Sequence, residues 1–313
     1  MTRSARFREL FKTPPFVCMG AFDAVTALLA EQSGAPAVFV SGFTASAVLA
    51  GEPDFGVLSQ TEMFDHIRRI CRVTSVPVFA DADTGYGGPL EARRTMQLWQ
   101  EAGASALHLE DQVQPKKCGH FAGKELVSVH EMQQKLRAMI EARTDPDFFI
   151  VARTDAVAVT GIDDAIARLK SYADVGADGL YVDAPESMEH LARIGRELKP
   201  LGKPLLFNMA RSGKSPFLTL REVHELGFDF VLCPVEPLLA MHKAVKDVMR
   251  TFMQEGTTNA IAGQMTPFHE FNSFIGLQQM VDLQERYGTG DDVRSSLPGG
   301  VTRNGPRAGI AVP

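Results

Sequence analysis

Short apolar runs alternate along the chain with longer segments in which apolar residues recur at helical spacing. This alternation is typical of a parallel sheet whose strands are joined by crossover helices. Most of the short runs are almost continuously apolar, which indicates strands covered on both faces. The expected strands are Val17–Gly20, Ala37–Ser41, Val78–Ala80, Ala106–Glu110, Phe149–Arg153, Gly179–Val182, Leu205–Asn208 and Phe230–Pro234. The expected helices are Asp23–Gln32, Thr61–Val73, Leu90–Ala102, Val129–Ala142, Ile162–Val175, Met188–Lys199, Leu220–Leu226 and Leu238–Gln254.

A weak internal repeat supports this phasing. Gly34, Gly103, Gly176 and Gly227 each begin a short segment that joins the end of a helix to the next strand. Glycine suits this place because the residue after a helix often adopts a positive φ. A succession of such units favours a closed α/β barrel of the (β/α)₈ TIM type over an open doubly wound sheet, and barrels of about 250 residues form one domain. We therefore expect a barrel over residues 1–258.

The residues after 258 exceed what a barrel needs. Between Pro267 and Glu285 an amphipathic pattern gathers large apolar residues on one face: Phe268, Phe271, Phe274, Ile275 and Leu277. Such a face needs another surface to cover it. We expect residues 259–287 to form an extra C-terminal helix. Residues 288–313 are rich in Gly, Pro, Ser and Arg and lack periodicity, so an irregular or flexible tail is expected.

Composition narrows the functional classes. The chain is 45% hydrophobic and 22% charged, with a formal net charge of −6 and no basic block, so nucleic acid is not an expected partner. The N-terminus lacks the apolar segment of a secretory signal, and no run reaches the roughly 18 apolar residues that span a bilayer, so we expect no membrane association and a cytoplasmic protein. The four cysteines form no CxxC pair, which argues against a zinc site or a disulfide framework.

Acidic residues follow two neighbouring expected strands, at the barrel end where chemistry is usually found. Asp81 and Asp83 follow one strand, Glu110 ends the next, and Asp54 can reach them from a loop. Two residues apart on an extended strand end, Asp81 and Asp83 point the same way. Carboxylates gathered without a compensating Lys or His in the sequence are ligands for a hard cation, so we predict Mg²⁺, with Mn²⁺ as the alternative ion. The other interpretation is that some of these acids cap the following helices.

Two further strand ends offer groups that can bind an anionic substrate. Arg153 ends an apolar strand, and its planar guanidinium is suited to bidentate binding of a substrate carboxylate. Pairing with Asp155 is the structural alternative. The turn Ser41-Gly42-Phe43 offers a hydroxyl and unencumbered backbone N–H groups, an anion-holding arrangement of low specificity.

The segment Lys116-Lys117-Cys118-Gly119-His120 is the strongest single signal. A thiol near two ammonium groups and an imidazole has its thiolate favoured electrostatically, so it can exchange a proton near neutral pH. Its place after the fourth strand is where barrels carry lids, and the glycines at 119 and 123 would allow movement. The alternative is a solvated basic loop in which the cysteine is incidental.

Four segments together resemble the isocitrate lyase and phosphoenolpyruvate mutase superfamily, over roughly Phe7 to Tyr287. They are Asp81-Ala-Asp-Thr-Gly-Tyr-Gly, Leu109-Glu-Asp-Gln-Val, Lys116-Lys-Cys-Gly-His and Val151-Ala-Arg-Thr-Asp-Ala. The chain looks most like the small members, such as 2-methylisocitrate lyase, 2,3-dimethylmalate lyase and the petal death protein. The resemblance implies a homotetramer in which the extra C-terminal helix packs on a neighbouring subunit.

The resemblance also implies roles for the matching positions. Asp83 would hold Mg²⁺ directly, with Asp81, Asp54 and Glu110 acting largely through waters, and Cys118 would protonate a carbanion. The candidate catalytic residues are Lys116, Cys118, His120 and Arg153. The candidate substrate-binding residues are Ser41, Gly42, Phe43, Gly119, His120, Arg153, Asn208, Arg211 and Ser215.

Three positions depart from the lyase pattern. Asp183 stands where these relatives usually have Glu, Arg211 replaces an acid, and Glu236 replaces a small hydroxyl residue. We interpret Arg211 and Glu236 as a compensating pair, or Arg211 as a group that binds an additional substrate carboxylate. An alignment that slips within the loop is the other explanation.

With this resemblance, the sequence predicts a Mg²⁺-dependent carbon–carbon lyase. The resemblance implies that its substrate is a small 2-hydroxy di- or tricarboxylate, of the 2-alkylmalate or 2-methylisocitrate type, cleaved through an aci-carboxylate to a 2-oxo acid and a carboxylic acid. Alternative activities on the same site are oxaloacetate hydrolysis or decarboxylation and a carboxyphosphonoenolpyruvate-type mutase. A non-catalytic barrel that binds a 2-oxo acid is the alternative from a different class.

Overall fold

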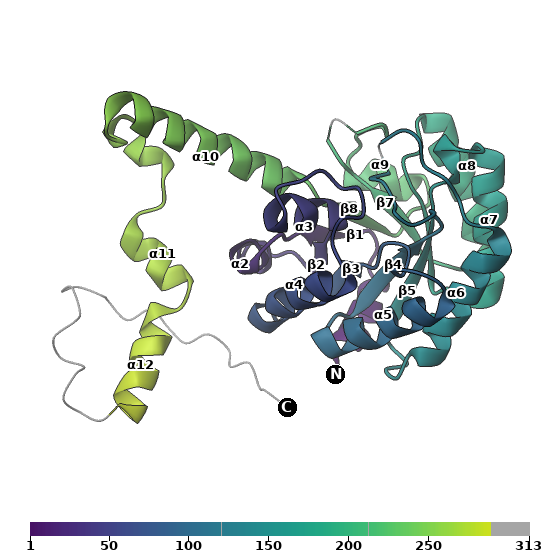
Figure 1. Ribbon diagram of the computed structural model, residues 1–313, viewed down its shortest axis with the longest axis horizontal. Helices are drawn as coiled ribbons and strands as arrows, with labels where there is room; N and C mark the ends of the chain where they lie inside the picture. Colours follow the sequence, from purple (N-terminus) through teal and green to yellow (C-terminus); the bar gives the residue numbers. More distant parts are fainter. Residues whose placement is uncertain (120, 212, 289–313) are drawn as a thin grey trace. The chain divides into compact units, whose positions relative to one another are not determined.

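The computed structural model describes residues 1–288 except residues 120 and 212. Parallel strands pair in sequence order and close into a barrel, because β1 pairs with both β2 and β8. The strands are β1 Phe16–Gly20, β2 Ala37–Val40, β3 Val78–Asp81, β4 Ala106–Glu110, β5 Phe149–Thr154, β6 Gly179–Val182, β7 Leu205–Asn208 and β8 Phe230–Cys233. Figure 1 shows these strands at the centre of the barrel with helices around them. The predicted (β/α)₈ TIM-type barrel is confirmed.

The surrounding helices begin and end at residues that the sequence provides for that purpose. They are α2 Ala24–Gln32, α4 Gln60–Val73, α5 Pro89–Ala102, α6 Val129–Ala142, α7 Ile162–Val175, α8 Met188–Leu198 and α9 Leu220–Glu225, with short 3₁₀ turns η1 Ala156–Ala158 and η2 Lys199–Leu201. Side-chain oxygens of Asp23, Ser59, Ser128, Ser187 and Thr219 cap helix N-termini. The four repeat glycines adopt φ from +86° to +110°, as expected of the residue after a helix.

Two helices were not expected from the sequence, α1 Arg3–Leu10 and α3 Gly42–Leu49. Only Ser4 and Phe7 of α1 are buried, so the sequence shows no repeated apolar face there. Tertiary contacts hold the helix instead, since the Arg3 guanidinium donates to the carbonyl oxygens of Cys71 at 2.7 Å and Thr74 at 2.6 Å.

The apolar core has two parts. One lies between the strands and the surrounding helices, and the other fills the barrel interior. In the interior part, Phe7 from α1 contacts the aromatic rings of Phe16, Phe79, Phe149 and Phe230, which lie at the first or second positions of their strands. Helix α1 thus closes the N-terminal end of the barrel and leaves the C-terminal end for the site.

The described residues fall into two compact units, the first ending at Met241 and the second beginning at His242, within α10 (Glu236–Glu255). The second unit also contains η3 Asn259–Gln264, α11 Phe268–Phe274 and α12 Leu277–Tyr287. The expectation of one extra helix is wrong, because Gly276 adopts a φ of +91° and separates α11 from α12. The tail predicted for 288–313 lies outside the described residues, apart from residue 288. No helix in the part of the chain that is described has the length and apolar character needed to cross a membrane.

Candidate active site

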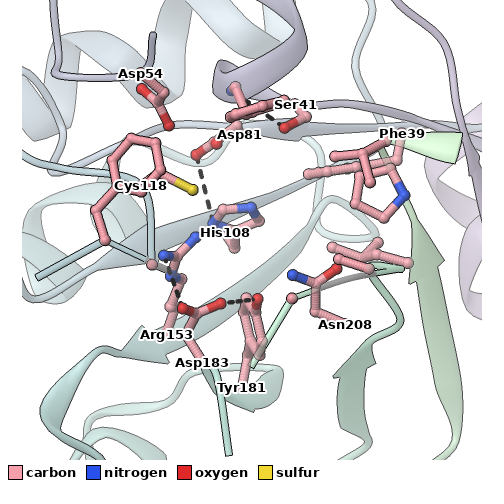
Figure 2. A pocket seen from close by; sticks show the side chains of 18 of the residues that line it. Phe39, Ser41, Asp54, Asp81, His108, Cys118, Arg153, Tyr181, Asp183 and Asn208 are labelled. Atoms are coloured by element: carbon pink, nitrogen blue, oxygen red, sulfur yellow. Dashed lines mark hydrogen bonds and ion pairs between the residues drawn. The ribbon is translucent and has the colours of Figure 1, made fainter. Parts of the chain in front are cut away.

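A cavity of about 310 Å³ lies at the C-terminal end of the barrel, a size that suits a small ligand. Several predicted site residues line it, namely Ser41, Phe43, Asp54, Asp81, Cys118, Gly119, Arg153, Asn208 and Arg211. Figure 2 shows Asp54 and Asp81 on one side of the cavity and Arg153 on the opposite side, with the Cys118 sulfur directed into the space between them. His120 lies outside the described residues.

A buried cation lies among the predicted metal ligands. The Lys116 ammonium is 2.7 Å from Asp54 Oδ2 and 2.9 Å from Asp83 Oδ1, and all three side chains are buried. Burial alone would lower the pKa of Lys116, but Asp83 and Asp54 outweigh it and raise that pKa well above its usual value. The expectation that these acids lack a compensating cation is wrong, because the loop after β4 folds back over them.

Asp81 and Asp83 converge for a different reason from the one expected. Strand β3 ends at Asp81, and Asp83 adopts a φ of +45°, so a left-handed turn rather than strand alternation sets its direction. Asp81 Oδ1 accepts the Asp83 N–H at 2.9 Å, and its Oδ2 accepts the Gly42 N–H at 3.0 Å, the first residue of α3. Asp81 therefore accepts a hydrogen bond from the start of α3, a helix that precedes it in the chain, and not from the helix that follows it, which the alternative interpretation required.

The expected anion-holding turn Ser41-Gly42-Phe43 is already hydrogen-bonded. The Phe43 N–H donates to Ser41 Oγ at 3.2 Å, and the Gly42 N–H donates to Asp81 as described above. The prediction of unencumbered N–H groups is wrong, because these residues begin α3 and their N–H groups are capped by Ser41 Oγ and the Asp81 carboxylate.

Burial and neighbouring charges set the pKa values of the two aspartates apart. Burial opposes ionisation of Asp81, but His108 and Lys116 outweigh it and lower its pKa to about 2. Burial raises the pKa of Asp83 to about 7, although Lys116 works in the opposite direction. In the same cluster burial holds the pKa of Glu110 well above its usual range.

The residues around Gly42 have the oxygen donors that a hard cation needs. A Cβ atom at Gly42 would lie 3.0 Å from Asp81 Oδ2, 3.0 Å from Asp83 Oδ1 and 3.2 Å from Lys116 Nζ, so these atoms face one small space. Glu110 Oε2 is buried and makes no hydrogen bond among the described residues, although Arg153 Nη1 lies 3.2 Å from it. As they stand, no three His, Cys, Asp or Glu residues of the described chain form a metal-binding group. These carboxylate oxygens are the donors that Mg²⁺ prefers, and in this structure the Lys116 ammonium lies between two of them, Asp54 and Asp83.

Arg153 is surrounded by carboxylates. Its Nε and Nη2 donate to the two oxygens of Asp155 at 2.8 and 3.0 Å, its Nη1 lies 3.2 Å from Glu110 Oε2, and its Nη2 lies 3.4 Å from Asp183 Oδ2. The guanidinium also stacks on Tyr181, with 5.3 Å between its carbon and the ring centroid. The predicted alternative, pairing with Asp155, is thus observed, and Arg153 lines the cavity as well.

Sequence reasoning missed His108, Tyr181 and Lys124. His108 lies two residues before Glu110 on β4, so the period of a strand could have indicated that both face the barrel interior. Burial lowers the pKa of His108 to about 4, so its imidazole is neutral near pH 7. The hydroxyl of Tyr181 donates to Asp183, and the buried Lys124 ammonium pairs with Asp155 at 2.9 Å.

The loop that carries Cys118 is fixed at its base by an antiparallel bridge between Gln112 and Leu126. The Cys118 N–H donates to the Asp54 carbonyl at 3.0 Å. The ammonium groups of the neighbouring lysines have other partners. Lys116 pairs with Asp54 and Asp83, and Lys117 donates to the Gly123 carbonyl at 2.5 Å. Each ammonium thus has an acceptor of its own, and its electrostatic effect on the thiol stays a prediction.

Arg211 and Glu236 are joined through the backbone. Glu236 Oε1 accepts the Arg211 N–H at 2.8 Å, and its Oε2 accepts the Cys233 thiol at 3.2 Å. The Arg211 guanidinium lies over the Phe217 ring, 4.2 Å from its centroid, and lines the cavity. The compensating ion pair that the sequence suggested is not formed among the described residues. Asn208 Oδ1 and Ser215 Oγ are buried without a hydrogen-bond partner among those residues.

The chain is similar in sequence and in fold to enzymes of one superfamily. The family described as phosphoenolpyruvate phosphomutase matches residues 7–253. The chain is 38% identical to 2,3-dimethylmalate lyase of Eubacterium barkeri, over 93% of this chain and 100% of that protein. It is 39% identical to 2-methylisocitrate lyase of Aeropyrum pernix, over 86% of each.

Solved structures give the same result. A 2,3-dimethylmalate lyase structure, described as a member of the PEP mutase/isocitrate lyase superfamily, superposes with a TM-score of 0.85 at 31% identity, over 92% of this chain and 96% of that one. Oxaloacetate acetylhydrolase with 3,3-difluorooxalacetate gives 0.85 at 30%, over 92% and 97%. Phosphonopyruvate hydrolase with oxalate and Mg²⁺ gives 0.83 at 28%, over 92% and 99%.

Proposed function

The chain belongs to the phosphoenolpyruvate phosphomutase family and is a carbon–carbon lyase of the isocitrate lyase superfamily, and on this premise we propose that it cleaves a small 2-hydroxy di- or tricarboxylate with Mg²⁺. The observation that carries the proposal is one cavity lined by a buried arginine, a cluster of buried carboxylates and a cysteine. An arginine suits a substrate carboxylate, carboxylates suit a hard cation, and a thiol suits proton transfer.

In the proposed reaction the C2 hydroxyl loses its proton and the C2–C3 bond breaks. C2 then becomes the carbonyl carbon of a 2-oxo acid, and the electron pair stays with C3 and its carboxylate as an aci-carboxylate. Cys118 supplies the proton that C3 requires to complete the second product. Its sulfur is directed into the cavity between the acidic cluster and Arg153, where C3 of a bound substrate would lie (Figure 2).

Arg153 and the acidic cluster orient the 2-oxo-acid portion of the substrate. Asp155 binds the guanidinium with two hydrogen bonds, so the group is held in place before a substrate binds. Bound Mg²⁺ would supply positive charge beside the oxygens on which negative charge develops. Asp54, Asp81, Asp83 and Glu110 are the residues that would hold it. Ser41, Phe43, Gly119, Asn208 and Ser215 remain the candidates for further substrate contacts.

A product assay tests this function. With Mg²⁺, the purified protein is expected to release a 2-oxo acid from 2,3-dimethylmalate or 2-methylisocitrate, together with one equivalent of a carboxylic acid. The 2-oxo acid is measured by reduction with lactate dehydrogenase, and the carboxylic acid by chromatography. Oxaloacetate is assayed in parallel. Oxalate and acetate from oxaloacetate alone would indicate a hydrolase, and pyruvate and CO₂ from it alone a decarboxylase, and either result would contradict the proposal.

Arg211 is the residue that we propose to choose between dicarboxylates and tricarboxylates. Its guanidinium rests on Phe217 at the cavity, and no ion pair joins it to a carboxylate of the described chain. A tricarboxylate such as 2-methylisocitrate carries one carboxylate more than 2,3-dimethylmalate, attached through C3. Arg211 can pair with that group, whereas Arg153 is assigned to the 2-oxo-acid portion.

Replacing Arg211 by Gln is expected to lower kcat/KM for 2-methylisocitrate relative to 2,3-dimethylmalate by about 10- to 100-fold, the value of one charged hydrogen bond. Steady-state kinetics on both substrates measures this ratio. Lys214→Gln serves as the control, because Lys214 lies on the same loop and pairs with Glu186 at 3.4 Å instead of lining the cavity. An unchanged ratio in Arg211→Gln would show that Arg211 does not select the substrate.

A further inference from the structure

Lys124 is a buried cation at the point where the loop after β4 meets the ends of β5 and β6. Its side chain is 1% exposed, and its ammonium donates to the Gly119 carbonyl at 2.5 Å and to Asp155 Oδ1 at 2.9 Å. A third acceptor, Asp183 Oδ2, lies 4.0 Å away. Burial would lower the pKa of Lys124, but Asp155 and Asp183 outweigh it and raise that pKa, so the group is charged. The steps of the proposed reaction do not use Lys124.

The contact with Gly119 acts on the residue next to Cys118. On one side, the Cys118 N–H donates to the Asp54 carbonyl at 3.0 Å, and on the other side Lys124 holds the Gly119 carbonyl. The two hydrogen bonds fix the backbone before and after the Cys118 side chain. They therefore set the point from which the thiol enters the cavity.

The path of the loop at Gly119 leaves no spare room. A Cβ atom at this position would overlap the Asp183 carboxylate and would lie 2.9 Å from Arg153 Nη2. The backbone of the loop thus packs directly against the group that stacks on Tyr181 and binds Asp155. Because the interior is close-packed here, a shift of the loop at Gly119 would displace Asp183 or Arg153 in the cavity wall.

The contact with Asp155 ties Lys124 to the proposed carboxylate-binding group. Asp155 shares its Oδ1 between Lys124 and Arg153, and its Oδ2 accepts from Arg153 as well. Its own N–H donates to Asp111 Oδ1 at 3.0 Å, which anchors it to the end of β4. The Asp155 carboxylate therefore binds both Lys124, which holds the loop, and Arg153.

We propose that Lys124 is a positioning residue, which fixes the Cys118 thiol relative to Arg153 by joining the Gly119 carbonyl to Asp155. The proposal rests on the proposed function in that Cys118 is the proton donor. Proton transfer requires the donor to lie within hydrogen-bond reach of the reacting carbon, and a displacement of about 1 Å can lower a rate 100-fold. Charged hydrogen bonds are strong enough to impose such a position on a loop.

Two substitutions at Lys124 distinguish the effect of its positive charge from the effect of its hydrogen-bond donor. Lys124→Met removes the donor and the charge while keeping a long side chain, whereas Lys124→Gln keeps a donor without the charge. Lys170→Met is the control, because it removes a lysine–carboxylate pair with Glu197 (3.1 Å) on the outer helices of the same barrel. Each protein is assayed in full length with Mg²⁺ for kcat and KM on 2,3-dimethylmalate and 2-methylisocitrate.

A second measurement does not depend on catalysis. Iodoacetamide is added to each folded protein, and the alkylation rate of Cys118 is read from its peptide by mass spectrometry. Cys18 and Cys71 are buried and serve as internal references. Thermal unfolding is followed in parallel, so that a loss of global stability is distinguished from a local change at the loop.

Lys124→Met is expected to raise the Cys118 alkylation rate about tenfold and to lower kcat about 100-fold, with KM changed less than kcat. Lys124→Gln should fall between Lys124→Met and the natural protein, and Lys170→Met should match the natural protein. If only Tm falls, while the alkylation rate and kcat stay within about twofold, the proposal is overturned. Failure of both Lys124 variants to fold would make Lys124 a residue of the barrel's stability and would overturn it as well.

The two readouts also separate this inference from the proposed function. Faster alkylation of Cys118 in Lys124→Met would support the positioning role even if no tested carboxylate were cleaved. Cleavage by the natural protein, with the Lys124→Met alkylation rate and kcat unchanged, would support the lyase function and overturn the role of Lys124.

Discussion

Removal of divalent cations with EDTA is expected to abolish cleavage, with a fall in kcat of about 1000-fold or more. Negative charge develops on the oxygens of the breaking substrate next to the cluster of Asp54, Asp81, Asp83 and Glu110. Without Mg²⁺ only the Lys116 ammonium offsets the charge of these carboxylates, so the developing charge is poorly stabilised. Activity is measured after dialysis against EDTA and again after Mg²⁺ or Mn²⁺ is restored. Turnover that persists in EDTA would contradict the proposed metal dependence.

The same experiment has a structural control. In the described structure the Lys116 ammonium pairs with both Asp54 and Asp83, at 2.7 and 2.9 Å, and offsets part of their charge. The EDTA-treated protein is therefore expected to remain folded, with the far-UV circular dichroism of the native protein. In Lys116→Met the carboxylates lose this partner, and buried charges without a partner are destabilising by about 3–5 kcal/mol. Only that variant should require Mg²⁺ for its stability, and an equal Mg²⁺ effect on the Tm of both proteins would contradict the interpretation.

Replacing Cys118 by Ser is expected to lower kcat by about 100- to 10,000-fold, the usual contribution of a general acid. A serine hydroxyl has nearly the size of a thiol but releases its proton far less readily. The aci-carboxylate would therefore be protonated more slowly, by water. KM should change by less than about threefold, because the proposed role of Cys118 lies in the transition state rather than in substrate binding. Steady-state kinetics on 2,3-dimethylmalate and 2-methylisocitrate measures both parameters.

Cys71→Ala is the matched control for this substitution. Cys71 is a buried residue of α4, remote from the cavity lining, so its replacement should leave kcat unchanged and lower stability slightly. A Cys118→Ser protein with the kcat of the natural enzyme would exclude the thiol as the proton donor.

Much of the fold was predictable because its signals are local. Each strand is a short apolar run, and each of the four repeat glycines follows a helix and adopts the positive φ expected of it. Helix α1 carried no such signal, because it has a single large buried residue, Phe7, and is held by arginine contacts to distant carbonyl groups. The break at Gly276 between α11 and α12 lay inside a stretch whose apolar periodicity runs through it. The expected homotetramer and Mg²⁺ ligands stay predictions.

The candidate site was likewise predictable where its signals are local in the sequence, and unpredictable where distant residues meet. The sequence by itself determined which strand ends carry acids, an arginine and an amide, since residues at the ends of parallel strands meet at one end of a barrel. It also singled out Cys118 by its unusual polar neighbours. Only the tertiary structure decided which charges pair: Lys116 lies between Asp54 and Asp83, and Lys124 lies beside Asp155. The physical reason is that a lysine on a loop can reach several acids, and the folded path of that loop selects the partner.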